Sequence, residues 1–311
     1  FYAINPTEVI VNIVRQVNTL FMFLHFGIFI YKLKDRKRLL SLIIMGILAI
    51  EVYAVLEQAL EMYKAGSISP GNLKGVTANR NITAFSIAIK IPFVVYLLLF
   101  SNKIYKKIFY SFLIFLSLFS ISLIQSRASY IAVFLVGALI LLYSAYNYYK
   151  TKSLKELSIN LFYIIPFFLA ILFNQIFISD KGVSAIKRAA TIGRGITDNS
   201  INQRFRYYQD VFNQIGETPV FGVGLGNWKL KSIYHDRLDI DGYIVPYHAH
   251  SDFIQLGAEL GIFGFIFYLG IFLIAAYFAY FLIFKSDLDY DSKWFITALI
   301  SALGVYFIDA N

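Results

Sequence analysis

The chain has 311 residues, of which 58 % are hydrophobic and only 15 % charged, with a formal net charge of +9 and no cysteine. Its mean hydropathy is +0.64. Soluble domains carry about 25 % charged residues, so this much apolar surface must face lipid rather than water. The composition excludes a cytosolic enzyme, a nucleic-acid-binding module and a secreted disulfide scaffold. The lack of cysteine also excludes iron–sulfur clusters and thiolate zinc sites.

Eight apolar stretches are long enough, or nearly so, to cross a bilayer as helices, which takes about 20 residues. Four of them contain no charged residue: 108–125, 128–149, 157–179 and 260–284. Four others are short or contain a histidine or a charged residue: 16–31, 39–60, 81–101 and 294–308. The sequence therefore predicts an all-α membrane protein, a polytopic bundle of about eight spans. We also expect the chain to be part of a longer protein.

Every second connection between the predicted spans is short and basic, which is typical of the cytoplasmic side. These connections lie near residues 32–38, 103–107, 150–155 and 285–293. The opposite side holds a loop at 61–81, a tight corner at 125–127 and a long segment at 180–251. We predict three parts: six spans in 1–179, a mainly helical extracytoplasmic segment in 180–251, and two spans in 252–311.

The long outer segment contains most of the candidate functional groups. Residues 203–215 have helical spacing, with an expected apolar stripe of Phe205, Tyr208, Phe212 and Ile215. After Pro219, glycine occupies every second position from 222 to 226. Such a run forms either a tight turn or a loop whose backbone N–H groups can bind an anion. His248 and His250 are two residues apart and Asp239-x-Asp241 precedes them, but neither pattern has the companions that a metal site needs. We predict no metal site.

Four ordered motifs together resemble the O-antigen ligase and O-antigen polymerase superfamily of bacterial membrane glycosyltransferases. They are Gly75 with Asn79-Arg80-Asn81 and Ala84; Ser126-Arg127-Ala128; Arg204, Tyr208 and Pro219 with Gly222-x-Gly224-x-Gly226; and His250 with Glu259, Gly261 and Gly264. The resemblance covers residues 70–285. Three positions depart from the family pattern: Tyr208 replaces a Trp, Ser251 replaces an Asn, and Arg80 stands where a small residue is common.

The resemblance implies transfer of a glycan from a polyprenyl-diphosphate carrier to an acceptor hydroxyl, without a cofactor or nucleic acid. It implies the bacterial inner membrane, a site facing the periplasm, and lipid A-core as acceptor in lipopolysaccharide synthesis. Polymerisation of the glycan and glycosylation of a protein acceptor remain open within the same superfamily. From other classes, a transporter or flippase for lipid-linked glycans and a non-catalytic scaffold also remain open.

The family motifs and the charges together suggest roles for individual residues. Arg127 and Arg204 are expected to bind the diphosphate, because the guanidinium fork matches phosphate oxygens two at a time. His250 is expected to act on the acceptor hydroxyl, as a base or as a hydrogen-bond partner. These three residues are predicted to form one site. The substrate-binding residues expected around them are Arg206, Gly222, Gly224, Asn79, Asn81, His248 and Glu259.

Two charged residues fall deep inside predicted spans. Glu51 lies about 18 Å into a helix that enters from the basic side, and Lys90 lies about 13–14 Å into a helix that enters from the other side. In a hydrocarbon core about 30 Å thick, both reach a similar depth. An unpaired charge there is costly, so we predict a structural ion pair between them.

Overall fold

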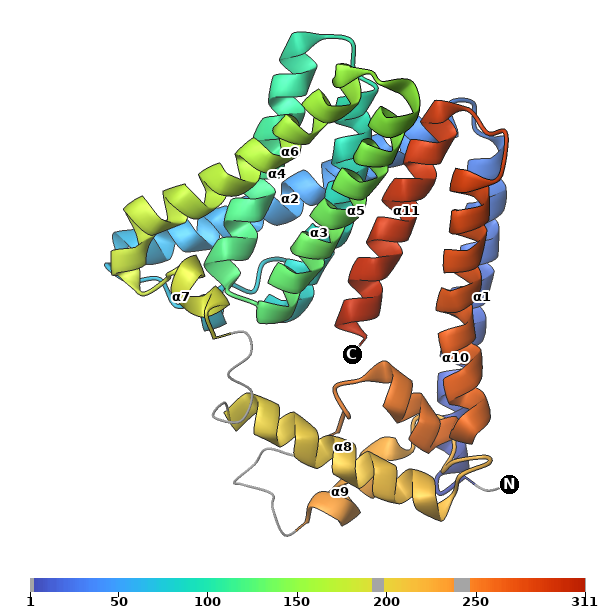
Figure 1. Cartoon of the computed structure of the whole chain (residues 1–311). Coiled ribbons are helices and arrows are strands. Elements are labelled where there is room, and N and C mark those ends of the chain that lie inside the picture. Colours follow the sequence, from blue (N-terminus) through green and yellow to red (C-terminus); the bar gives the residue numbers. More distant parts are fainter. Residues whose placement is uncertain (1–2, 192–198, 238–246, 311) are drawn as a thin grey trace. The chain divides into compact units, whose positions relative to one another are not determined.

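The computed structural model describes residues 3–191, 199–237 and 247–310, and all regular structure in these ranges is helical (Figure 1). Within these ranges, eight helices are long and apolar enough to cross a membrane. Seven of them are α1 (Pro6–Lys32), α2 (Arg36–Lys64), α3 (Arg80–Leu99), α4 (Ile104–Ile124), α5 (Arg127–Thr151), α10 (Asp252–Phe284) and α11 (Tyr290–Asp309). The eighth covers Asn160–Lys181, which is α6 (Leu154–Phe173) with its continuation. The prediction of a polytopic all-α membrane protein is confirmed.

Shorter helices connect these spans: α7 (Ala185–Ala189), α8 (Asn199–Glu217) and α9 (Trp228–Asp236), with the single turns η1 (Pro70–Asn72), η2 (Asn174–Ile178) and η3 (Ser179–Lys181). Two spans, α1 and α10, begin about eight to ten residues earlier than hydropathy predicts. Helix α1 begins at Pro6 because the Asn5 side chain accepts from the N–H groups of Thr7 and Glu8. Helix α10 begins at Asp252, and its first turns are polar.

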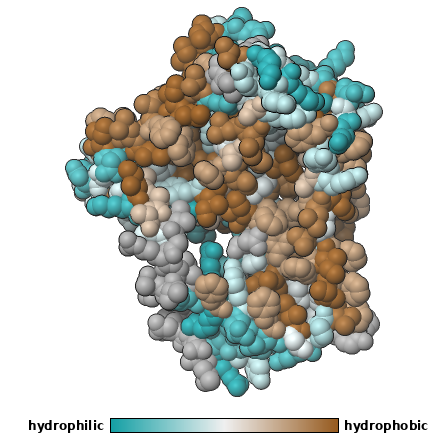
Figure 2. All heavy atoms as spheres, in the orientation of Figure 1, coloured by the Kyte–Doolittle hydropathy of each residue, from teal (hydrophilic) through white to brown (hydrophobic). Residues whose placement is uncertain are grey.

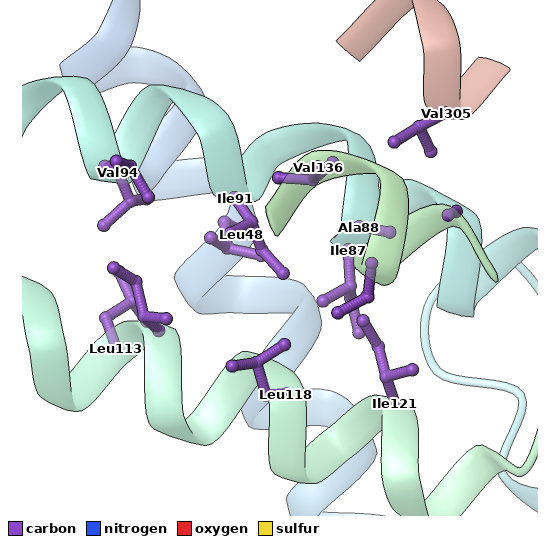
Figure 3. Packing of buried hydrophobic residues seen from close by; sticks show 14 of the residues in the cluster. Leu48, Ile87, Ala88, Ile91, Val94, Leu113, Leu118, Ile121, Val136 and Val305 are labelled. Carbon is purple, nitrogen blue, oxygen red and sulfur yellow. The ribbon is translucent and has the colours of Figure 1, made fainter. Parts of the chain in front are cut away.

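The chain divides into two compact units. Unit 1 comprises Phe1–Lys34, Arg194–Ala275 and Ala310–Asn311, and unit 2 comprises Asp35–Gly193 and Ala276–Asp309. In unit 2, α3 packs against α2, α4 and α11, while α5 packs against α6 and α11. Figure 3 shows the resulting core, where the buried Leu48 of α2 lies beside Ile91 of α3 and the buried Ile87 of α3 lies near Ile121 of α4. This close packing makes unit 2 a stable framework for the residues at its two ends.

The predicted ion pair in the membrane is confirmed within unit 2. Lys90 Nζ lies 2.9 Å from each carboxylate oxygen of Glu51. The Ser86 hydroxyl donates to the same carboxylate at 2.7 Å, and Lys90 also donates to the Ser86 carbonyl. Glu51 keeps only 5 % of its surface exposed. Each charge is thus satisfied by protein groups, as a charge in hydrocarbon requires.

In unit 1, α8, α9 and the start of α10 enclose a small core of Val211, Trp228, Ala249 and Ala258. The face of α8 that packs into this core differs from the face that the sequence predicts to be buried. Tyr207, Val211 and Gln214 are buried, whereas Phe205 and Phe212 are exposed.

The predicted apolar stripe on α8 is therefore wrong by about one position along the helix. Spacing alone placed the large aromatic rings inside, but the core of unit 1 takes the neighbouring face.

The surface reflects the two environments of the chain. In Figure 2, hydrophobic residues cover much of the visible face of the long helices, and hydrophilic residues gather around α8 and α9 and at helix ends. Helix α1 has no buried residue, and Phe23 and Met22 are among its most exposed side chains. Such a surface is stable in lipid and not in water.

Candidate functional site

His250 occupies a strained position directly before α10. Its φ angle is +58°, in the left-handed region that non-glycine residues rarely adopt. Two consecutive residues of α8 hold it there. The Tyr207 ring stacks on the imidazole, with centroids 5.9 Å apart and planes at 19°. The Tyr208 hydroxyl donates to the His250 carbonyl at 3.4 Å. Strain of this kind occurs mainly at functional sites.

The surroundings of His250 disfavour its charged imidazolium form. Partial burial lowers the pKa of His250, and the positive charge of Arg204 and the neighbouring His248 lower it further. Burial likewise raises the pKa of Tyr208, while Arg204 opposes that rise. Arg204, Tyr208, His248 and His250 therefore share one neighbourhood in unit 1. A neutral imidazole beside a guanidinium can accept a proton next to a site that attracts anions.

A chain of hydrogen bonds connects the His250 segment to a buried carboxylate. The Ala249 N–H donates to Gln255 Oε1 at 3.1 Å. Gln255 Nε2 donates to Glu259 Oε1 at 3.2 Å, and Glu259 Oε2 accepts from the Gly226 N–H at 2.7 Å. Ala249 and Glu259 are both buried. Residues 222–226, with their three alternate glycines, are called the glycine loop below. Through Gln255, Glu259 connects this loop to residues 249–250.

The glycine loop packs directly on the backbone of α10. The Gly222 N–H donates to the Thr218 carbonyl at 3.1 Å, and the Gly224 N–H donates to the Glu259 carbonyl at 2.8 Å. Both N–H groups are therefore used inside the protein. Binding of substrate by Gly222 and Gly224 stays a prediction, and the role that the geometry supports is close packing of two backbones.

Two of the motif glycines are required by this close approach. Gly261 has φ +69° inside α10, and a Cβ there would lie 2.1 Å from the Val220 carbonyl oxygen. Gly222 has φ +64°, and a Cβ there would lie 2.4 Å from the Glu259 carbonyl carbon. No side chain fits at these distances. The motif therefore specifies a kink in α10 and a loop that fits into it.

Arg206 is held by a carboxylate within unit 1. Its Nε lies 2.8 Å from Asp236 Oδ1, and Nη2 donates to Oδ2 at 3.3 Å. Asp236 is only 1 % exposed. This two-point contact fixes α8 to α9. A substrate contact for Arg206 stays a prediction.

The other predicted site residues belong to unit 2. Arg127 is the first residue of α5, directly after the buried Ser126. Asn79 caps α3 by accepting from the N–H groups of Asn81 and Ile82, and both Asn79 and Asn81 are exposed. The structure thus groups Arg204, His248 and His250 within unit 1. One shared site of Arg127, Arg204 and His250 remains a prediction.

Within the described ranges, no three or more His, Asp or Glu side chains come together in a way that suits a metal ion. Asp239 and Asp241 lie outside these ranges.

Three residues of the site escaped sequence reasoning: Tyr207, Gln255 and Asp236. Tyr207 and Val211 are four residues apart on one helix face, a signal that the more numerous aromatic residues of α8 obscure. Asp236 has no local signal, because its partner Arg206 is 30 positions away. Gln255 is four residues before Glu259 on one helix, a spacing that could have indicated their contact.

The comparisons with known proteins agree with these motifs. A family model described as O-antigen ligase matches residues 112–269, slightly more than half of the chain. Neither the curated proteins nor the solved structures gave a match. The matched range contains Arg127, Arg204, the glycine loop and His250. The chain belongs to the O-antigen ligase family, whose members are glycosyltransferase-like membrane enzymes.

Proposed function

We propose that this protein transfers a glycan from a polyprenyl-diphosphate carrier to an acceptor hydroxyl, as an O-antigen ligase acting on lipid A-core. Family membership supports glycan transfer of the ligase or polymerase type. The observation that carries the proposal is that Arg204 and an exposed His250 lie in one unit, where partial burial and the charge of Arg204 lower the pKa of His250. Unit 1 then contains both groups that this reaction needs, a base and a group that binds an anion.

In the proposed reaction, the acceptor hydroxyl gives its proton to the neutral imidazole of His250. The hydroxyl oxygen attacks the anomeric carbon of the donor sugar, and the bond from that carbon to the diphosphate oxygen breaks. The electron pair of this bond stays on the diphosphate. The rate depends on stabilising that developing charge.

Arg204 and Arg127 are proposed to stabilise the leaving diphosphate. Each guanidinium offers paired donors that match phosphate oxygens, and its charge persists at all physiological pH values. Arg127 is the first residue of the span α5, and the predicted topology would put it on the outer side, where a lipid diphosphate is expected. We propose that these arginines make a divalent metal unnecessary.

The sidedness of the basic loops supports an active site on the periplasmic face of the bacterial inner membrane. The donor is then taken from the outer leaflet of that membrane.

Two experiments test this function. Purified protein with lipid-linked donor glycan and lipid A-core should form the glycan–lipid product, and the same rate should persist in excess chelator. Loss of activity in chelator, restored by magnesium or manganese, would refute metal independence. Deletion of the gene should leave lipid A-core without long glycan. Chains of a single repeat would indicate a polymerase instead, and unmodified glycoproteins would indicate protein glycosylation.

A further inference from the structure

A polar cavity lies at the basic end of unit 2. It has a volume of about 340 Å³ and is formed by the start of α2, the end of α3, the start of α4 and the start of α11. Helix α4 separates its lining residue Lys103 from the corner at Arg127. A helix of 21 residues spans about 30 Å, so this cavity is distinct from the corner at Arg127.

The lining of this cavity has an excess of positive charge. Arg38, Lys103 and Lys106 contribute cations, and Asp35 and Asp291 contribute carboxylates. Asp291 is already engaged, because it forms an ion pair with Lys37 and accepts from the Tyr96 hydroxyl at 2.7 Å. Three cations therefore face the remaining carboxylate of Asp35. A concave site with an excess of one charge concentrates the field for a ligand of opposite charge.

These cations have no protein partner that explains their clustering. Among the described residues, the side chains of Arg38 and Lys106 form neither a hydrogen bond nor an ion pair, and Lys103 only lies over the Tyr105 ring at 5.8 Å. Lys106 is also partly buried. Arg38 and Lys103 are exposed. Like charges gathered in one concave site repel one another, and a bound anion relieves that repulsion.

The start of α4 adds a further positive partial charge to the cavity. Its cap residue is Lys103, which makes no side-chain cap, and the first turn contains no acidic residue. The positive end of the helix dipole thus meets several lysines instead of a carboxylate. A bound anion would relieve both the dipole and the lysine charges.

The hydroxyl of Tyr110 adds a neutral donor to these cations. Tyr110 lines the cavity and is 6 % exposed, and its hydroxyl has no hydrogen-bond partner among the described residues. The hydroxyl is accessible from the cavity, where it can donate a hydrogen bond to a bound anion. We propose that the cavity binds a phosphate group, held by Arg38, Lys103, Lys106 and the Tyr110 hydroxyl. The phosphate belongs to an anionic lipid headgroup or to a soluble phosphate compound.

The proposal is tested on the purified full chain with two probes. Phosphatidic acid is added to protein in neutral detergent, and bound lipid is counted by native mass spectrometry against phosphatidylcholine. Inorganic phosphate is titrated separately by calorimetry at constant ionic strength. Preference for phosphatidic acid that phosphate cannot displace identifies a headgroup site. Binding of phosphate that displaces the lipid identifies a site for soluble phosphate.

The variants Arg38→Gln and Lys106→Gln should each weaken binding about tenfold or more, as expected for loss of a charge-assisted contact. Tyr110→Phe keeps the shape of the ring and should weaken binding several-fold. The control is Lys107→Gln, which removes the same charge from the adjacent residue; Lys107 lies over the Phe162 ring instead of in the cavity.

Equal weakening by Lys107→Gln and Lys106→Gln would overturn the proposal, because general surface charge would then explain binding. Failure of both probes to bind would overturn it as well. Neither result bears on glycan transfer, which is measured with different variants.

Discussion

The imidazole of His250 lies nearly parallel to the ring of Tyr207, with centroids 5.9 Å apart and planes at 19°. Tyr207 is 5 % exposed and belongs to α8, the helix that also carries Arg204. One helix therefore orients the proposed base and supplies the charge that lowers its pKa. The pKa of His250 therefore reports whether Arg204 and His250 interact.

Replacing Arg204 with Gln should raise the pKa of His250 towards its ordinary value of about 6.5. The reason is that Arg204 disfavours the imidazolium, so its removal makes that form less costly. NMR titration of ring-labelled histidine measures the shift without any transfer assay. In the wild type, the lowered pKa keeps the imidazole neutral to more acidic pH, so the acid limb of the transfer rate lies below that value. In Arg204→Gln the limb moves to higher pH.

The control for this titration is Arg237→Gln, which removes an exposed cation of the same unit that lies over the Tyr234 ring. A pKa of His250 that is unchanged by Arg204→Gln, or moved equally by Arg237→Gln, would show that the two residues are not coupled.

Replacing Gln255 with Leu should slow transfer about 10- to 100-fold while leaving donor affinity nearly unchanged. The substitution keeps the approximate size but removes the acceptor of the Ala249 N–H and the donor to Glu259. A misplaced base costs rate rather than binding. Rate and donor affinity are measured separately, with Gln209→Leu as the control because Gln209 bonds only on the exposed face of α8. A wild-type rate in Gln255→Leu would show that the chain of hydrogen bonds does not position His250.

Breaking the ion pair in unit 2 should be more costly than removing it. Lys90→Met or Glu51→Gln alone should lower the free energy of unfolding by about 3 kcal/mol or more, because the partner charge stays buried. The double variant should lose less than the sum of the two single variants. Unfolding in mixed micelles measures these differences. Glu57→Gln is the control, since Glu57 is exposed on the same helix; strictly additive losses would mean that the pair is not coupled.

Replacing Gly261 with Ala should destabilise unit 1, because the added Cβ would overlap the Val220 carbonyl and the backbone would be strained at φ +69°. The expected result is a lower thermal midpoint and loss of transfer. Gly270→Ala is the matched control on the same helix, where a Cβ meets nothing within 4 Å. If both variants were equally stable, the kink would not depend on a glycine.

Hydropathy was sufficient to predict the spans, because crossing hydrocarbon demands about 20 apolar residues and leaves a clear pattern. Depth along two helices was also sufficient to predict the contact between Glu51 and Lys90, since a charge in lipid has few alternatives to pairing. The first prediction needs only the hydropathy of one segment at a time. The second needs only the depth of each charge along its own helix.

The interior of unit 1 could not be predicted in this way. The buried face of α8 is Tyr207, Val211 and Gln214, although Phe205 and Phe212 are more hydrophobic, because the partner elements determine which face is covered. The contact between Gly226 and Glu259 joins residues 33 positions apart, and that between Arg206 and Asp236 joins residues 30 apart. No local pattern specifies such pairs. The family motifs identified the glycines and Glu259 as important, and the structure adds packing as a reason.

The most direct test of the central claim measures donor affinity and transfer rate separately for His250→Ala and Arg204→Ala, in detergent with lipid-linked donor. We predict that His250→Ala loses transfer by about 10²-fold or more with donor affinity nearly intact, as expected for loss of a general base. Arg204→Ala should weaken both donor affinity and rate, as expected for loss of a group that stabilises the leaving anion. If His250→Ala instead bound donor poorly and transferred at the normal rate once saturated, the assignment of base and anion-binding group would be contradicted.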